Sequence, residues 1–186
     1  PEVTVEVDLT PPTASVSVSN GDEDTGDEPG EPVEEGALTF SESRVLGCLL
    51  EKEATTPDHY PLTQNSLQSA CNQKSSRDPV TDFDEDLVER ALEGLRDKSL
   101  VVKQHLSGSR VPKYSHTIDR VYNFDEAQRA LICVLMLRGV QTAGELNQRT
   151  DRIHKFGSVD AVEHTLGTLI DYPAGALVRK LPPGSG

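Results

Sequence analysis

Apolar positions recur at helical spacing twice in this chain, each time in the same arrangement. Residues 86–97 and 160–171 align position for position. The matched pairs are Asp86/Asp160, Val88/Val162, Glu89/Glu163, Leu92/Leu166, Leu95/Leu169 and Asp97/Asp171. In each copy the valine and the leucines lie three or four residues apart, which is the spacing of one apolar face of a helix. The pattern predicts two equivalent amphipathic helices.

Each of these helices is followed by a short β-prone run that ends in a basic residue. Residues 100–103 read Leu-Val-Val-Lys, and residues 177–180 read Leu-Val-Arg-Lys. Upstream, Thr39 with Glu42 predicts a helix capping box, and Asp125 with Gln128 matches this pair in the second copy. The order helix, helix, helix, strand therefore occurs twice. This order predicts a mainly α fold with small β-hairpin wings, built as two winged helix-turn-helix domains in tandem.

The first domain is predicted over residues 38–121 and the second over residues 122–186. In the first, a helix begins after Thr39, a second runs from about residue 63 to 71, and a third is capped by Asp84. A hairpin follows over residues 100–116, with its tip at residues 107–109. The second domain repeats this with shorter parts. Its helices are expected from residue 126, after Thr142 and after Ser158, and a single wing strand covers residues 177–181. Because no return strand follows that strand, the second wing is expected to be truncated.

Residues 1–37 differ from the rest of the chain in charge. They contain 11 acidic residues and no Lys or Arg, whereas the remaining residues carry 20 acids and 18 bases. Val3, Val5 and Val7 alternate as in a strand. However, Pro11-Pro12 follows and no partner strand is near in sequence. Low apolar content and high net charge predict that residues 1–37 form a disordered acidic leader.

The chain has three cysteines, Cys48, Cys71 and Cys133, and no CxxC pair. All three fall at apolar helical positions, where a free cysteine acts as a small buried hydrophobe. Such usage fits a reducing cytoplasm. The longest apolar run, residues 130–137, is too short to span a membrane. The sequence therefore predicts a cytoplasmic protein with no membrane partner.

Several long strings resemble the YceH-like family of bacterial proteins. Residues 45–57 read Val-Leu-Gly-Cys-Leu-Leu-Glu-Lys-Glu-Ala-Thr-Thr-Pro, and residues 70–80 contain Ala-Cys-Asn-Gln-Lys-Ser and Arg-Asp-Pro-Val. Tyr-Pro-Leu at residues 60–62, residues 108–116 and residues 137–146 extend the similarity. The resemblance implies a tandem winged-helix fold and a cytoplasmic bacterial protein. It brings no catalytic residues and no activity, and it does not include the acidic leader.

A winged helix usually places its third helix in the DNA major groove while the wing touches the backbone. Here the predicted third helix of the first domain exposes five acids and two bases. They are Glu85, Asp86, Glu89, Arg90, Glu93, Arg96 and Asp97. The corresponding helix of the second domain exposes acids and no Lys or Arg. Like charges would oppose the approach of either helix to phosphates, which counts against ordinary recognition-helix readout.

The basic residues gather instead on the predicted hairpin and on the polar loop at residues 72–79. The candidate contacts to nucleic acid or to a partner are Lys74, Arg77, Lys103, His105, Arg110, Lys113 and His116. The second domain adds Arg149, Arg152, His154, Lys155, Arg179 and Lys180. Lysine and arginine here could bind phosphates. Alternatively, they form a solvated face that protects strand edges from aggregation.

The sequence carries no enzyme signature. Its five histidines are scattered, with no HExxH pair, and neither GxGxxG nor a P-loop occurs. The prediction is a binding protein that is not an enzyme and needs no cofactor or metal. Two functions remain open. One is a DNA-binding or transcription-related regulator that contacts duplex phosphates through the basic wing. The other is a protein–protein interaction scaffold, and a homodimer is compatible with both.

Overall fold

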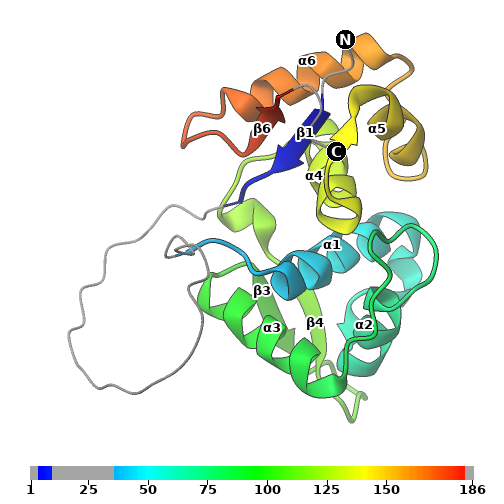
Figure 1. Cartoon of the computed structure of the whole chain (residues 1–186). Helices are drawn as coiled ribbons and strands as arrows, with labels where there is room; N and C mark the ends of the chain where they lie inside the picture. The colour runs from blue at the N-terminus through cyan, green and yellow to red at the C-terminus, as the bar shows by residue number, and fades with distance from the viewer. Residues whose placement is uncertain (1–3, 10–35, 183–186) are drawn as a thin grey trace, which may run out of the picture.

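The computed structural model describes residues 4–9 and 36–182 (Figure 1). We call residues 36–121 the first half and residues 122–182 the second half. The first half contains α1 (Phe40–Thr55), β2 (Leu62–Thr63), α2 (Gln64–Cys71), α3 (Glu85–Asp97), β3 (Val101–Gln104) and β4 (Lys113–His116). The second half contains α4 (Glu126–Arg138), β5 (Gln141–Thr142), α5 (Ala143–Arg149), α6 (Val159–Ile170) and β6 (Val178–Leu181). Two 3-10 turns, η1 (Pro57–His59) and η2 (Ile118–Arg120), complete these halves, and β1 (Thr4–Val7) precedes them.

The described chain is a mixed α/β protein in which the order helix, strand, helix, helix, strand occurs twice. Its strands form two small antiparallel sheets of three strands each, in the orders β2-β4-β3 and β5-β1-β6. The predicted helices and the first hairpin are confirmed to within a residue or two. The short strands β2 and β5, which precede the second helix of each half, were not predicted.

Side-chain caps fix where the helices begin. At α1, the Thr39 hydroxyl accepts the Glu42 backbone N–H at 3.1 Å, and the Glu42 carboxylate accepts the Thr39 N–H at 3.2 Å. At α4, Asp125 and Gln128 make the same reciprocal pair at 2.7 and 3.0 Å. Each pair satisfies two N–H groups that have no partner within the helix. The predicted capping box at Thr39 is therefore present, and the matching pair at Asp125 forms a second one.

The two halves share one hydrophobic core, with α1 packed against α4 at its centre (Figure 1). Residues 44–51 of α1 and residues 130–137 of α4 are all buried. Gly47 allows the close approach, because a Cβ there would lie only 3.0 Å from Leu137. The Cys133 thiol donates to the Gly47 carbonyl at 3.4 Å. Cys48, Cys71 and Cys133 are all free and buried, which confirms their interpretation as core residues.

We expect alanine to have opposite effects at two helical glycines. A Cβ at Gly47 would lie 3.0 Å from Leu137 and 3.1 Å from Met136, whereas a Cβ at Gly167 of α6 would meet nothing within 4 Å. Gly47→Ala should therefore lower the free energy of unfolding by about 1–3 kcal/mol through overpacking. Gly167→Ala should raise it by roughly 0.5–1 kcal/mol through helix propensity. Urea unfolding followed by circular dichroism checks both, and shifts of the same sign would contradict the packing of α1 on α4.

The N-terminal strand corrects one prediction. Residues 4–9 were expected to be disordered, but β1 pairs with β5 on one side and with β6 on the other. Val5 is fully buried and Leu9 is 5% exposed. The partner strands lie at the opposite end of the sequence, so local reasoning could not find them. Residues 1–3 and 10–35 of the predicted leader lie outside the described residues.

No helix in the described ranges combines the length and the apolar character that crossing a membrane requires.

Candidate nucleic-acid interface

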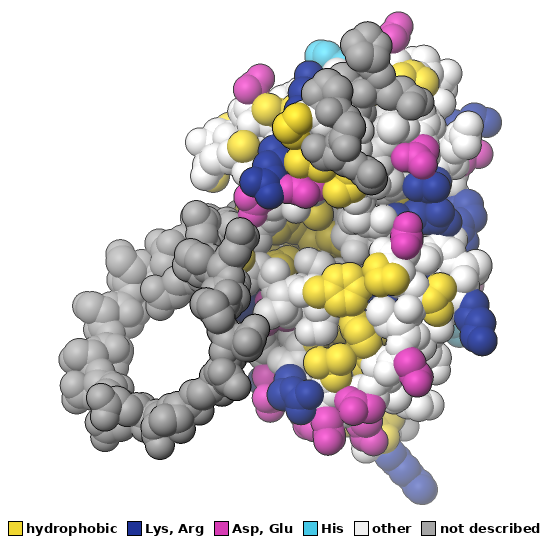
Figure 2. Space-filling view, viewed as in Figure 1, with side chains coloured by type: hydrophobic (Ala, Val, Ile, Leu, Met, Phe, Trp, Pro, Cys, Tyr) yellow, Lys and Arg dark blue, Asp and Glu magenta, His cyan; other side chains and the backbone are white. Residues whose placement is uncertain are grey.

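The third helix of the first half presents an acidic surface. Asp84 caps α3, and Val88, Leu92 and Leu95 face the core. All seven charged residues predicted to be exposed on this helix are exposed. Figure 2 shows acidic side chains gathered at the lower part of the molecule, where Figure 1 draws α3. Phosphates would meet five carboxylates and two guanidinium groups here, so α3 is a poor surface for nucleic acid.

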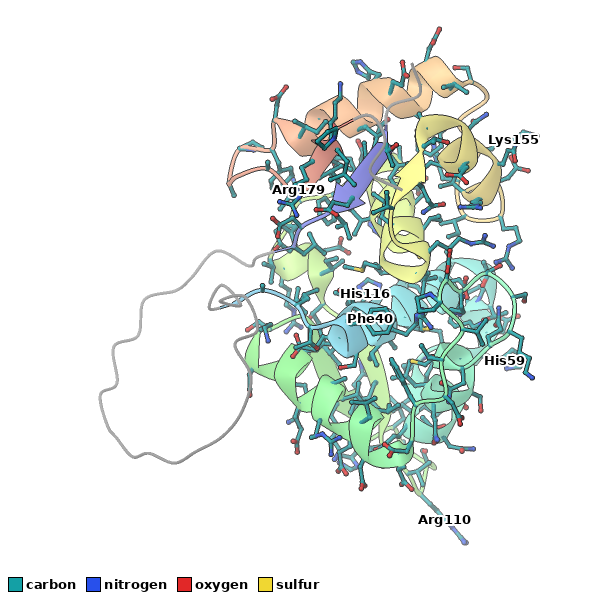
Figure 3. All side chains as sticks on the ribbon, viewed as in Figure 1. Phe40, His59, Arg110, His116, Lys155 and Arg179 are labelled. Carbon is teal, nitrogen blue, oxygen red and sulfur yellow. The ribbon has the colours of Figure 1, made fainter. Side chains whose placement is uncertain are left out.

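The hairpin of β3 and β4 has the opposite charge. Residues 98–118 include four Lys or Arg residues and no acidic residue. Buried Val101 and Tyr114 fix its two strands on the core, and the Lys103 ammonium lies 5.9 Å from the centre of the Tyr114 ring. Arg110 extends from the tip into solvent (Figure 3). Of the seven predicted contacts, the structure places Lys74, Lys103, His105 and Arg110 on the exposed surface and leaves Lys113 half-buried.

The structure places the other two predicted contacts in the interior, where they bind partners within the protein. His116 is 9% exposed, and its ring nitrogen Nε2 bonds to the Glu53 carboxylate. Arg77 is 5% exposed and donates two hydrogen bonds to Glu51, at 2.8 and 3.1 Å. Arg77 Nε also donates to the Ala70 carbonyl at 3.0 Å. Neither side chain is free to contact a ligand, because each bonds to a carboxylate that lies far away in the sequence.

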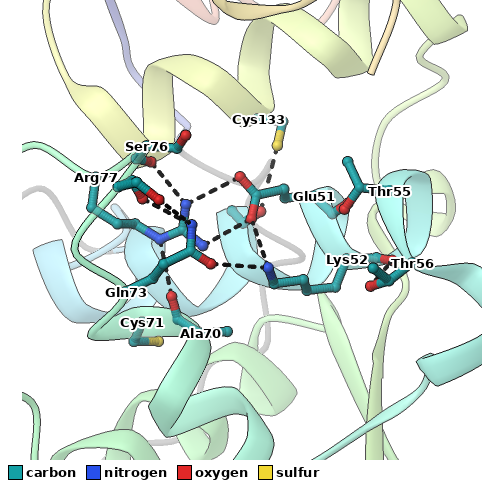
Figure 4. A network of polar contacts seen from close by, with 12 residues as sticks. Glu51, Lys52, Thr55, Thr56, Ala70, Cys71, Gln73, Ser76, Arg77 and Cys133 are labelled. Atoms are coloured by element: carbon teal, nitrogen blue, oxygen red, sulfur yellow. Dashed lines mark hydrogen bonds and ion pairs between the residues drawn. The ribbon is translucent and has the colours of Figure 1, made fainter. Parts of the chain in front are cut away.

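Glu51 is the centre of a network that joins the two halves (Figure 4). Besides Arg77, its carboxylate contacts Lys52 at 3.3 Å and Arg152 of the second half at 3.5 Å. Burial raises the pKa of Glu51, but the hydrogen bonds and charge of Arg77, with help from Lys52, outweigh it, and the pKa is lowered. Burial lowers the pKa of Arg77. The hydrogen bond and charge of Glu51 raise the pKa by more than burial lowers it, so the net shift is upward. One buried carboxylate thus faces three positive charges.

This excess of positive charge continues along one side of the molecule. We call the half-buried or exposed bases along it the basic band: Lys52, Lys74, Lys113, Arg138, Arg149 and Arg152. Lys113 and Lys52 line one hollow of about 430 Å³, together with Asp58 and His59. The Lys52 ammonium donates to the Gln73 side chain at 3.1 Å, and Lys74 follows in the same loop.

The loop then meets the second half. The Ser76 hydroxyl lies 3.4 Å from the Arg152 guanidinium, and Ser76 lines a small hollow together with Arg138, Arg149 and Arg152. Figure 2 shows lysine and arginine side chains gathered on the right-hand side of the molecule, and Figure 3 labels Lys155 above them, beside α5. The basic band therefore crosses both halves.

The three arginines of the second half are close enough to repel one another. Burial lowers the pKa of Arg138, and the charges of Arg149 and Arg152 lower it further. Arg149 is partly balanced by Glu145, at 3.4 Å, and its guanidinium donates to the Gln141 side chain at 2.9 Å. A bound anion would relieve the remaining repulsion. Sequence reasoning noted Arg149 and Arg152 but missed Lys52 and Arg138, since only the packing of α1 on α4 brings these four together.

A larger hollow, of about 920 Å³, lies between α4 and α6. Three of its polar side chains, those of Gln128, Thr168 and Tyr172, bond to neighbours within the protein. The Asn123 N–H donates to the Tyr172 hydroxyl at 2.9 Å, and the Gln128 amide donates to Thr168 at 3.0 Å. Within residues 4–9 and 36–182, no group of three or more His, Cys, Asp or Glu side chains is arranged to hold a metal ion.

Comparison with known proteins decides the family. Residues 38–186 match the family described as "Protein of unknown function, DUF480". The chain belongs to this DUF480 family. A UPF0502 protein of Vibrio atlanticus is 49% identical over 153 residues, which cover 80% of this chain and 70% of that protein. A UPF0502 protein of Solibacter usitatus is 50% identical over 150 residues, with the same coverage. The predicted membership of an uncharacterised bacterial family is confirmed under the DUF480 description. The region that matches the family, residues 38–186, includes the hairpin and the basic band and begins after β1.

Proposed function

We propose that this DUF480 chain is a non-enzymatic DNA-binding protein of the tandem winged-helix type, with a role related to transcription. The first winged helix comprises α1, α2, α3 and the β3–β4 hairpin. The second comprises α4, α5, α6 and the sheet that contains β6. The matching order of elements in the two halves supports this assignment.

The separation of charge supports a particular mode of binding. Exposed carboxylates cover α3, whereas the hairpin and the basic band present lysine and arginine side chains. Affinity for duplex DNA comes mainly from neutralising phosphates. The duplex therefore lies along the hairpin and the basic band, and α3 faces away from the phosphates. Contacts of this kind position the protein without reading base sequence.

A salt series tests this proposal. Fluorescence anisotropy with a labelled duplex should give a binding constant whose logarithm falls linearly with the logarithm of salt concentration. If about five phosphates are neutralised, the slope should be about −4 to −5. Absence of binding at low salt, or a slope near zero, would rule against phosphate contacts as the basis of function.

A protein–protein interaction scaffold is the second candidate, and an apolar patch supports it. Phe40 and Val80 are each 53% exposed, and the Phe40 ring packs edge-on against Phe83 at 6.1 Å. Figure 2 shows apolar side chains gathered on the front of the molecule, and Figure 3 places Phe40 there. Exposed apolar patches mark interaction sites. Stoichiometric capture of one protein, lost in Phe40→Ser while duplex binding persists, would favour the scaffold. Self-association lost in the same variant would indicate a homodimer.

A further inference from the structure

The strand β1 holds the same place in the second sheet that β4 holds in the first. In the first sheet, Tyr114 of β4 pairs with Leu62 of β2 and with Lys103 of β3. In the second sheet, Val5 pairs with Gln141 of β5 and with Lys180 of β6. The two registers continue in step. Positions 4, 5, 6 and 7 correspond to positions 113, 114, 115 and 116, and β1 is antiparallel to both its neighbours, as β4 is.

The equivalence continues past the ends of the strands. The Asp8 N–H donates to the Leu177 carbonyl at 2.8 Å, as the Thr117 N–H donates to the Leu100 carbonyl at 2.7 Å. One residue later, Leu9 is 5% exposed and Ile118 is fully buried, so each places an apolar side chain in the core at the equivalent position after its strand. Thr4–Leu9 therefore reproduces the backbone path of residues 113–118.

The side chains of this segment suit an extended strand that has one buried face. Val5 is fully buried, Val7 packs against the core and Leu9 continues the same face. Glu6 points the other way and pairs with Arg179 of β6. Alternation of apolar and polar residues is what a half-buried strand requires. The sheet thus selects its occupant by backbone hydrogen bonds and by apolar side chains at every second position.

The two sheets differ in how this strand is connected. Residues 105–112 join β3 to β4 in a hairpin, so β4 stays tethered close to its neighbouring strand. The segment that contains β1 joins no strand of its own sheet and continues instead toward α1 through residues 10–35. Only non-covalent contacts hold β1 between β5 and β6. Within the described residues, no hairpin therefore ties β1 to a neighbouring strand in the way that one ties β4 to β3.

We propose that the space between β5 and β6 is an acceptor site for an extended strand. Thr4–Leu9 is its resident strand, and a peptide of the same sequence binds there in trans when the resident strand is displaced. Because the resident strand is tethered, its effective concentration is on the order of millimolar, and a free peptide competes poorly with it. The test must therefore locate the resident strand first and then weaken it.

A cysteine pair in the full chain locates the resident strand. Glu6 and Arg179 lie directly opposite each other across β1 and β6, at a spacing that a disulfide can bridge. The variant with Glu6→Cys and Arg179→Cys should form this disulfide within one molecule under mild oxidation, as peptide mass spectrometry can show. The control combines Glu6→Cys with Val102→Cys, since Val102 holds the place of Arg179 in the other sheet. Equal cross-linking of the two pairs, or none in either, would overturn the proposal.

Val5→Asp in the full chain then opens the site. A carboxylate at this fully buried position should displace β1. A fluorescent peptide of residues 1–10 should bind this variant at least tenfold more tightly than it binds the original chain. The same peptide with aspartate at position 5 should bind neither protein. Equal affinity of the first peptide for both proteins would overturn the acceptor site. If Val5→Asp fails to fold, the cysteine pair still decides whether β1 is the resident strand.

Discussion

Replacing Arg77 with methionine is expected to lower the free energy of unfolding by about 3–5 kcal/mol. The Glu51 side chain is 2% exposed, and Arg77 provides its two shortest hydrogen bonds. Methionine fills a similar volume but leaves the carboxylate buried beside Lys52 and Arg152 alone. It also removes the donor to the Ala70 carbonyl. Urea unfolding monitored by circular dichroism measures the loss.

Arg152→Met is the matched control, because Arg152 contacts the same carboxylate. Its side chain is 60% exposed, so the pair is screened by solvent and its loss should cost less than about 1 kcal/mol. Combining Arg77→Met with Glu51→Leu should recover most of the lost stability, since the unpaired buried charge is then absent. A cost for Arg77→Met no larger than that for Arg152→Met would show that the buried pair does not support the fold.

The pH dependence of stability tests the Glu51–Arg77 pair in a second way. The pKa of Glu51 is lower in the folded protein than in the unfolded chain. Its contribution to stability is therefore complete above the unfolded pKa and is lost as the pH falls through the folded pKa. In Arg77→Met, burial without the guanidinium raises the pKa of Glu51 instead. Acidification should then narrow the difference in stability between the variant and the original chain, and a constant difference from neutral pH to about pH 4 would contradict this assignment.

Local sequence signals predicted most of the helical framework. Thr39, Asp84 and Asp125 accept N–H groups in the first turns of α1, α3 and α4, and this chemistry is complete within four residues. Gly139, with φ of 70°, ends α4 where an ordinary side chain would be strained. The spacing of Val88, Leu92 and Leu95 likewise identified the buried face of α3. Such features depend on neighbours along the chain, so they can be read without the fold.

The remaining features depend on contacts between distant parts of the chain. Arg77 looked like an exposed loop base because its partner, Glu51, lies on another element. His116 does lie on the hairpin, but it looked available to a ligand for the same reason, since its partner Glu53 is on α1. Val5 and Val7 carried the alternation of a strand, but the sequence did not show which strands would flank them. The residue type therefore indicates which kind of contact a side chain or strand can make. Which partner it contacts is known only from the fold, because the two lie far apart in the sequence.

Removing three separated bases from the proposed interface is expected to lower duplex affinity by about 10²–10³-fold at 0.1 M salt. The variant combines Lys74→Gln in the loop, Arg110→Gln at the hairpin tip and Arg152→Gln in the second half, all of which are exposed. Each lost phosphate contact should also flatten the slope of log K against log salt by about one unit. Anisotropy across a salt series measures both quantities.

The control removes the same net charge from other surfaces. Arg90→Gln, Arg96→Gln and Lys180→Gln change exposed residues of α3 and β6, away from the hairpin and the basic band. Each variant lowers the net charge of the chain by three, from −13 to −16, so the long-range repulsion of the duplex grows by the same amount in both. Only direct phosphate contacts distinguish them, so the control should keep the slope of the original chain. If both variants lose affinity and slope to the same extent, the hairpin and the basic band do not form the interface. Persistence of the full slope in the first variant would place the duplex elsewhere on the protein.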